Sequence, residues 1–145
     1  MLRVAINGYG RIGRSVLRAV YESGARESLE IVAINEPADA KTIAYLTRYD
    51  STHGRFPGTI SLEHQCLRIN GDSIALLEGK DLADLPWKDL GVDVVLECSG
   101  TFSDKHSAER HIKSGAKRVL FSQPAQADVD QTVVFGINES ALNGS

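Results

Sequence analysis

The sequence predicts an α/β fold with a doubly wound, mostly parallel sheet. Its first part alternates an apolar run, a helical pattern and a second apolar run, which is typical of a strand–helix–strand unit. A glycine-rich turn joins the first apolar run to the helix, and later apolar runs over 92–98 and 118–122 continue the arrangement. Because a crossover helix connects parallel strands, we expect a sheet of the Rossmann type.

Apolar periodicity and helix-capping residues predict the individual elements. Asp39 suits the N-cap of a helix, while Gly24 and Gly115 suit helix C-termini. Asn70-Gly71 separates two alternating runs and predicts a hairpin, so we expect a small antiparallel insertion. Residues 50–58 are expected to form a turn-rich connector. The predicted strands cover 2–7, 29–36, 59–63, 66–69, 73–77, 92–98, 118–122 and 132–136, and the predicted helices cover 11–23, 40–48 and 104–114.

The first helix is predicted to be amphipathic. Ile12 and Val16 recur at helical spacing on its apolar side, whereas Arg14, Arg18 and Glu22 are assigned to the polar side.

Composition describes one ordinary globular domain. The 145 residues are 42% apolar and 24% charged, with a net charge of −3, so we expect neither nucleic acid nor a membrane surface as a partner. No apolar run approaches the roughly 20 residues of a membrane span. The first residues enter a strand directly, which argues against a signal peptide, and two cysteines are too few for a disulfide framework. We therefore expect a cytoplasmic protein, and no motif predicts a metal site.

Three glycines with the spacing G-x-G-x-x-G lie between the first predicted strand and helix. Gly8 would allow the tight turn, Gly10 a close approach of a pyrophosphate, and Gly13 close packing of helix on strand. The N–H groups near Arg11 and Ile12 would then face the anion. The loop predicts a dinucleotide site, and the alternative is an ordinary glycine-rich turn.

An acidic residue ends the second predicted strand. Glu36 lies 23 residues after Gly13, close to the spacing at which such proteins place an acid that binds the adenosine ribose. A carboxylate there repels a 2′-phosphate, so Glu36 favours NAD over NADP. The alternative is a solvated acid at a strand end.

Small or polar residues end the other predicted strands as well, and ligands of doubly wound sheets bind at these ends. Cys98 lies among them, but nothing in the sequence marks it as activated, and we interpret it as a buried thiol. The sequence therefore predicts a cofactor site without a catalytic centre. The strand ends are Asn7-Gly8, Asn35-Glu36, Cys98-Ser99-Gly100 and Ser122-Gln123.

Four segments together resemble the phosphorylating glyceraldehyde-3-phosphate dehydrogenase family. They are AINGYGRIGR (5–14), YDSTHGRF (49–56), ECSG (97–100) and GAKRV (115–119). Within the family, Glu36, the segment LPW (85–87) and the segment FSQP (121–124) with ADVD (127–130) resemble the bacterial D-erythrose-4-phosphate dehydrogenase branch.

The resemblance implies NAD-dependent oxidation of a phosphorylated aldose. A cysteine thiolate, assisted by a histidine, would attack the aldehyde, and the resulting thioester would be cleaved by water in the erythrose branch and by phosphate in the glyceraldehyde branch. The erythrose branch yields 4-phosphoerythronate for pyridoxal 5′-phosphate synthesis. The family's nucleophile motif, SCTTNC, does not occur in these 145 residues. The resemblance therefore identifies 1–145 as an NAD-binding domain, with a catalytic domain and substrate site expected C-terminal to it and a homotetramer expected for the full-length protein.

The resemblance assigns cofactor roles to matching positions only. Arg11 and Ile12 resemble the pyrophosphate-binding pair, Glu36 the ribose acid, and Ser122 a residue near the nicotinamide. Lys80 replaces an arginine beside the adenine, which keeps the charge but loses the planar stacking surface. The predicted cofactor residues are Asn7, Gly8, Gly10, Arg11, Ile12, Gly13, Glu36, Lys80, Ser99, Gly100 and Ser122. A domain that senses NAD without redox chemistry is the alternative of another class.

Overall fold

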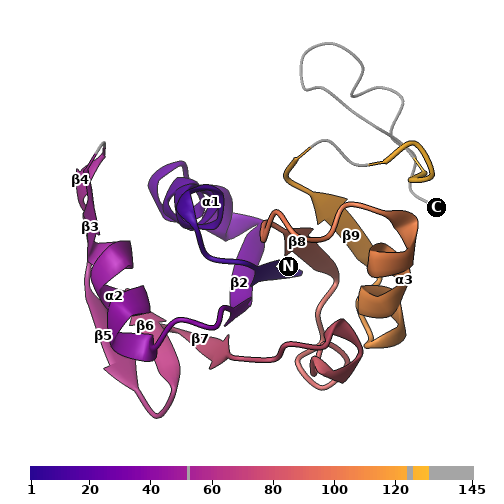
Figure 1. The fold of residues 1–145 in the computed structure, drawn as a ribbon. Coiled ribbons are helices and arrows are strands. Elements are labelled where there is room, and N and C mark those ends of the chain that lie inside the picture. The colour runs from indigo at the N-terminus through magenta and orange to yellow at the C-terminus, as the bar shows by residue number, and fades with distance from the viewer. Residues whose placement is uncertain (52, 124–125, 131–145) are drawn as a thin grey trace.

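The computed structural model describes residues 1–51, 53–123 and 126–130, and Figure 1 shows their arrangement. In this part of the chain, seven strands form one sheet in the order β5-β6-β7-β2-β1-β8-β9. The pairs from β7 to β9 are parallel. From β1 the chain adds strands on one side and then returns to add β8 and β9 on the other side. This confirms the predicted doubly wound, mostly parallel fold.

The elements agree with the predicted ones in type and largely in extent. The strands are β1 (Leu2–Asn7), β2 (Leu29–Asn35), β3 (Tyr49–Asp50), β4 (Gly54–Arg55), β5 (Ile60–Glu63), β6 (Cys66–Ile69), β7 (Asp72–Leu77), β8 (Val94–Glu97) and β9 (Arg118–Phe121). The helices are α1 (Arg11–Glu22), α2 (Ala40–Arg48) and α3 (Lys105–Lys113), with short 3-10 turns η1 (Ala25–Glu27) and η2 (Leu82–Asp84). The strand predicted over 132–136 lies outside the described residues. None of the described helices is long and apolar enough to cross a membrane.

The predicted helix caps are confirmed. The carboxylate of Asp39 accepts the N–H of Thr42 at the start of α2. Gly24 and Gly115 adopt left-handed conformations, with φ of +81° and +119°, directly after the C-caps of α1 and α3.

The predicted hairpin is present, but it belongs to the central sheet. Asn70 and Gly71 both have positive φ, as a two-residue turn between β6 and β7 requires. β7 then pairs in parallel with β2 and antiparallel with β6, so the insertion continues the sheet. Within the predicted connector over 50–58, a second hairpin forms from β3 and β4.

Two assignments on α1 are corrected. Arg18, placed on the polar side of the helix, is 3% exposed. Its Nη2 donates to the carbonyl groups of Thr47, Arg48 and Gly54, so the guanidinium joins α1 to α2 and to the β3–β4 hairpin. Ile12, placed on the apolar side, is 51% exposed. Backbone carbonyls replace water as hydrogen-bond acceptors for Nη2. Nη1 has no hydrogen-bond partner among the described residues and lies 3.7 Å from the carboxylate of Glu22.

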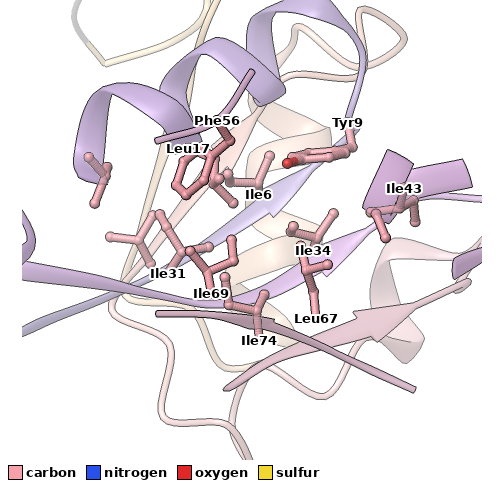
Figure 2. Close-up of a cluster of buried hydrophobic side chains, with 13 residues drawn as sticks. Ile6, Tyr9, Leu17, Ile31, Ile34, Ile43, Phe56, Leu67, Ile69 and Ile74 are labelled. Atoms are coloured by element: carbon pink, nitrogen blue, oxygen red, sulfur yellow. The ribbon is translucent and has the colours of Figure 1, made fainter. Parts of the chain in front are cut away.

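The core lies on both faces of the sheet because side chains alternate along each strand. On β1, Ile6 faces the cluster formed with α1 and α2, whereas Ala5 faces the cluster around Trp87. Figure 2 shows the first cluster, in which Leu17 of α1 and Ile43 of α2 lie over the sheet. On the other face, α3 packs against η2 and β9. Both faces are thus covered, as expected for a parallel sheet.

Candidate cofactor site

The polar strand ends lie side by side at the carboxyl edge of the parallel strands. Backbone hydrogen bonds of 2.7–3.1 Å connect each end to its neighbour across the sheet. The bonds run from the N–H of Gly8 to the carbonyl of Asn35, from Cys98 to Asn7, from Glu36 to Leu77, and from Ser122 to Glu97. The order of strands reverses at β1, so this edge contains the position at which doubly wound sheets bind ligands.

The three glycines of the loop differ in what a side chain would meet at each position. Gly8 has a φ of +94°, and a Cβ there would lie 2.4 Å from the Cα of Ser99. At Gly13, a Cβ would lie 2.4 Å from the carbonyl oxygen of Gly8. At Gly10, in contrast, no atom of the described residues beyond its chain neighbours lies within 4 Å of the Cβ position. The fold itself requires glycine at positions 8 and 13, whereas Gly10 leaves open space for a ligand.

The N-terminus of α1 begins at this open space. Gly10 is the N-cap and provides no side-chain cap, and the first turn contains no acidic residue. Arg11 and Ile12 are exposed, and the N–H of Arg14 makes the first helical hydrogen bond, to the carbonyl of Gly10. The preceding N–H groups carry the positive end of the helix dipole. This arrangement suits a phosphate group.

Tyr9 anchors the loop between its first two glycines. The side chain is 3% exposed and lies inside the core cluster, as Figure 2 shows. Thr47 donates to the carbonyl of Ile43, so the Tyr9 hydroxyl donates to Thr47 Oγ1 at 2.7 Å. Burial raises the pKa of Tyr9 to about 12, so it remains a neutral donor. The loop is therefore fixed to α2 on the side away from the open space.

Glu36 lies next to the glycine loop. Its Oε2 accepts the backbone N–H of Tyr9 at 2.7 Å, and its own N–H is bonded to the carbonyl of Leu77. The carboxylate is thus held beside the N-terminus of α1. This placement agrees with the predicted role of a ribose-binding acid.

Asn7 and Asn35 turn their amide groups along the sheet edge. Asn7 donates to Glu97 at 2.6 Å and accepts from Asn35 at 2.7 Å, so its side chain is engaged within the protein. Asn35 also bonds both the N–H and the carbonyl of Gly79, each at 2.9 Å. These bonds hold the segment that leads from the end of β7 to Lys80, which is exposed.

The turns after β8 and β9 converge on Glu97. Ser99 donates its N–H and hydroxyl to the Glu97 carboxylate, and Ser122 donates its N–H and hydroxyl to the Glu97 carbonyl. Gly100 has a φ of +77°, and a Cβ there would lie 3.5 Å from Oε1 of Gln123. All eleven predicted residues therefore belong to segments at this one edge. Asn7, however, is bonded within the protein through its side chain, to Glu97 and Asn35, and through its carbonyl, to the N–H of Cys98.

Comparison with known proteins agrees with this geometry. The sequence profile of the family described as "Glyceraldehyde 3-phosphate dehydrogenase, NAD binding domain" matches residues 2–105. The chain belongs to the glyceraldehyde-3-phosphate dehydrogenase family. Its cofactor is NAD, because the matched region is the NAD-binding domain of that family. The expected family and cofactor are confirmed.

Two relatives come from Cupriavidus necator strain H16. "Glyceraldehyde-3-phosphate dehydrogenase, plasmid" is 54% identical over 144 residues, which are 99% of this chain and 43% of the relative. "Glyceraldehyde-3-phosphate dehydrogenase, chromosomal" is 53% identical over the same shares of the two chains. The chain therefore spans less than half the length of these relatives.

The residues present fit the NAD of this dehydrogenase family. A dinucleotide needs an anion site for its pyrophosphate and an acceptor for its ribose hydroxyls. The open face at Gly10 and the uncapped N-terminus of α1 supply the first. Glu36, held 2.7 Å from the N–H of Tyr9, supplies the second.

A buried polar cluster at this edge was not predicted from the sequence. Glu97 is 1% exposed, and Trp87 and His111 are fully buried. Burial raises the pKa of Glu97, but hydrogen bonds from His111, Ser99 and Asn7 outweigh this effect and leave the pKa below its ordinary value. The available signal was the glutamate at the end of an apolar strand, since a buried carboxylate requires partners.

Cys98 has the environment predicted for an unactivated thiol. It is half-buried, and its pKa is raised by burial and by the nearby Glu97 charge, despite a hydrogen bond with Ser122. Within the described ranges, no three histidine, cysteine, aspartate or glutamate side chains are grouped to hold a metal ion. Cys98 is thus a half-buried thiol whose raised pKa does not favour the reactive thiolate.

Proposed function

We propose that this chain is the cofactor domain of an NAD-dependent dehydrogenase that oxidises the aldehyde of a phosphorylated aldose. The proposal depends on one observation above all: Glu36 lies beside a glycine loop whose Gly10 faces open space. When bound, NAD accepts the hydride. The residues of this chain bind and orient it.

Each part of the edge has a role in this proposal. The N–H groups that begin α1 bind the pyrophosphate, with Arg11 and Ile12 at the first helical positions. Glu36 accepts hydrogen bonds from the adenosine ribose and repels the 2′-phosphate of NADP. Lys80 lies beside the adenine, and Ser122 lies near the nicotinamide.

The substrate we propose first is erythrose 4-phosphate, with 4-phosphoerythronate as the product. Three sequence features support it: Glu36, the segment 85–87, and the segments 121–124 and 127–130. Glyceraldehyde 3-phosphate is the second candidate, and the names of the two C. necator relatives favour it. In either case the nucleophilic cysteine, the assisting histidine and the substrate site would lie in a C-terminal domain of a cytoplasmic homotetramer.

The decisive experiment uses the full-length protein that contains this chain. Calorimetry should show that NAD binds more tightly than NADP. Catalytic efficiency on the two aldehydes, measured with and without phosphate, should be higher for erythrose 4-phosphate and independent of phosphate. A higher, phosphate-dependent efficiency on glyceraldehyde 3-phosphate would replace the first candidate by the second. NAD binding without turnover of either aldehyde would instead favour a domain that senses NAD.

A further inference from the structure

One carboxylate connects the strand ends that form the cofactor edge. Oε2 of Glu97 accepts the N–H and the hydroxyl of Ser99 at 3.1 and 2.6 Å. Oε1 accepts the amide of Asn7 at 2.6 Å and Nε2 of His111 at 2.9 Å. The backbone carbonyl accepts the N–H and hydroxyl of Ser122 at 3.1 and 3.2 Å. Three predicted cofactor residues are therefore held by one glutamate that is itself buried.

The hydrogen bonds around this carboxylate have a single direction. An indole N–H can only donate, so Nδ1 of His111 accepts from Nε1 of Trp87 at 3.0 Å. Nε2 of the neutral ring therefore carries the proton and donates to Glu97. On the other side, the carboxylate can only accept, which directs the Asn7 amide nitrogen toward it and the Asn7 oxygen toward Asn35. The donors therefore point toward Glu97 from both sides, from Trp87 through His111 and from Gly79 through Asn35 and Asn7.

The bonded turn also limits the position of the glycine loop. Gly8 lies so close to the turn after β8 that a Cβ on it would be 2.4 Å from the Cα and 2.5 Å from the backbone nitrogen of Ser99. A shift of the Ser99 turn would therefore move the glycine loop or open a gap beside it. The Glu97 carboxylate accepts both the N–H and the hydroxyl of Ser99 and so holds this turn in place. It therefore indirectly sets the position of the glycine loop.

We propose that Glu97 is a positioning residue for NAD, acting through Ser99 on the glycine loop and through Asn7 and Asn35 on the segment before Lys80. It does not touch the cofactor in this proposal, because its oxygens are occupied by protein donors. The proposal rests on the assignment of the cofactor residues at this edge.

The test is the Glu97→Gln substitution in the full-length protein. The side chain keeps its shape, but one acceptor becomes a donor. Because Trp87 fixes His111 as a donor toward position 97, the glutamine oxygen must face His111. The new NH₂ group then faces the backbone N–H of Ser99, which can only donate, so this hydrogen bond is lost. We expect the dissociation constant for NAD to rise about five-fold or more, as for a lost charge-assisted hydrogen bond. Calorimetry measures the constant, and urea unfolding without NAD measures stability.

The matched control is Ile69→Val. Ile69 is fully buried and pairs with Asp72, at the end of β7 opposite the cofactor edge. This variant should lose stability and bind NAD as the wild type does. If Glu97→Gln binds NAD within about two-fold of the wild type, or if Ile69→Val weakens binding as much, the positioning role is wrong. A wild-type protein that binds no NAD would instead refute the cofactor site itself.

A second variant covers the case in which Glu97→Gln does not fold. Ser99→Ala, in an exposed turn, removes the 2.6 Å hydroxyl bond to Glu97 and a longer, 3.3 Å bond from the N–H of Thr101, and keeps the bond from the Ser99 N–H to Glu97. It should weaken NAD binding about two- to five-fold with a nearly unchanged melting temperature. An unchanged dissociation constant in this variant would overturn the proposal. If both variants fold, their combination should weaken NAD binding by less than the product of the single effects, and independent effects would contradict the coupling.

Discussion

The carboxylate of Glu36 accepts a 2.7 Å hydrogen bond from the backbone N–H of Tyr9, across 27 residues of sequence. The acid that is expected to bind ribose and the loop that is expected to bind pyrophosphate are thus joined directly. Tyr9 is in turn anchored in the core through its ring and hydroxyl. The spacing between the two subsites is therefore set before the cofactor arrives, which reduces the ordering required on binding.

Removal of the Glu36 carboxylate should weaken NAD binding. Glu36→Ala is expected to cost about 1–2 kcal/mol of binding free energy, because hydrogen bonds to the ribose are lost. The preference for NAD over NADP should decrease as well. Calorimetric titration with both cofactors measures the two effects. Glu30→Ala, near the start of the same strand and paired with Arg3, is the control and should leave both constants unchanged.

The first two glycines of the loop should respond to alanine in opposite ways. Gly8→Ala should cost about 1–3 kcal/mol of stability or more, because φ is positive and the methyl group meets Ser99. Gly10→Ala has open space, so its stability loss should stay below about 1 kcal/mol while NAD binding weakens. Urea unfolding and NAD titration separate the two outcomes. Equal stability losses would show that the open space at Gly10 is not present in solution.

Acid should destabilise the chain partly through Asp72. Hydrogen bonds from Arg26 hold the pKa of Asp72 below its ordinary value of 3.8, although burial opposes them. Its contribution to stability is therefore present above pH 3.8 and is lost as the pH falls below that value. The pair is partly exposed, so Asp72→Asn should cost only about 1 kcal/mol at pH 7 and nothing at the acid end of the titration. Unfolding free energies measured across this range, with the exposed Asp89→Asn as control, test the sign.

The indole of Trp87 should be required for its hydrogen bond as well as for its volume. Trp87→Phe leaves Nδ1 of the buried His111 without its donor, which should cost about 1–3 kcal/mol in addition to the lost packing. Circular dichroism in urea measures the loss, since this is the chain's one tryptophan. His106→Gln, at an exposed position of the same helix, should change stability by less than about 0.5 kcal/mol.

Local sequence patterns predicted the elements of the fold because each acts through residues close together in the chain. Asp39 caps its helix wherever the rest of the chain lies, and Asn70-Gly71 fits a two-residue turn by its backbone alone. The pairing of β7 with β2 was not predicted, because no local pattern specifies which edge a hairpin joins. The partners of Glu97 were not predicted either. Asn7 is 90 residues away and His111 is 14 residues away, so only the folded sheet brings them together.

The family match ends at residue 105, where α3 begins, and this boundary is a poor place to divide the protein. A fragment that stopped there would lack β9, so the hydrogen-bonding groups along one side of β8 would be bare and open to strands of other molecules. It would also lack His111, whose imidazole donates a hydrogen bond to the buried carboxylate of Glu97. A truncated version of this protein should therefore extend at least through Phe121. A shorter fragment could aggregate, and its failure to bind NAD would then be mistaken for the absence of a dinucleotide site.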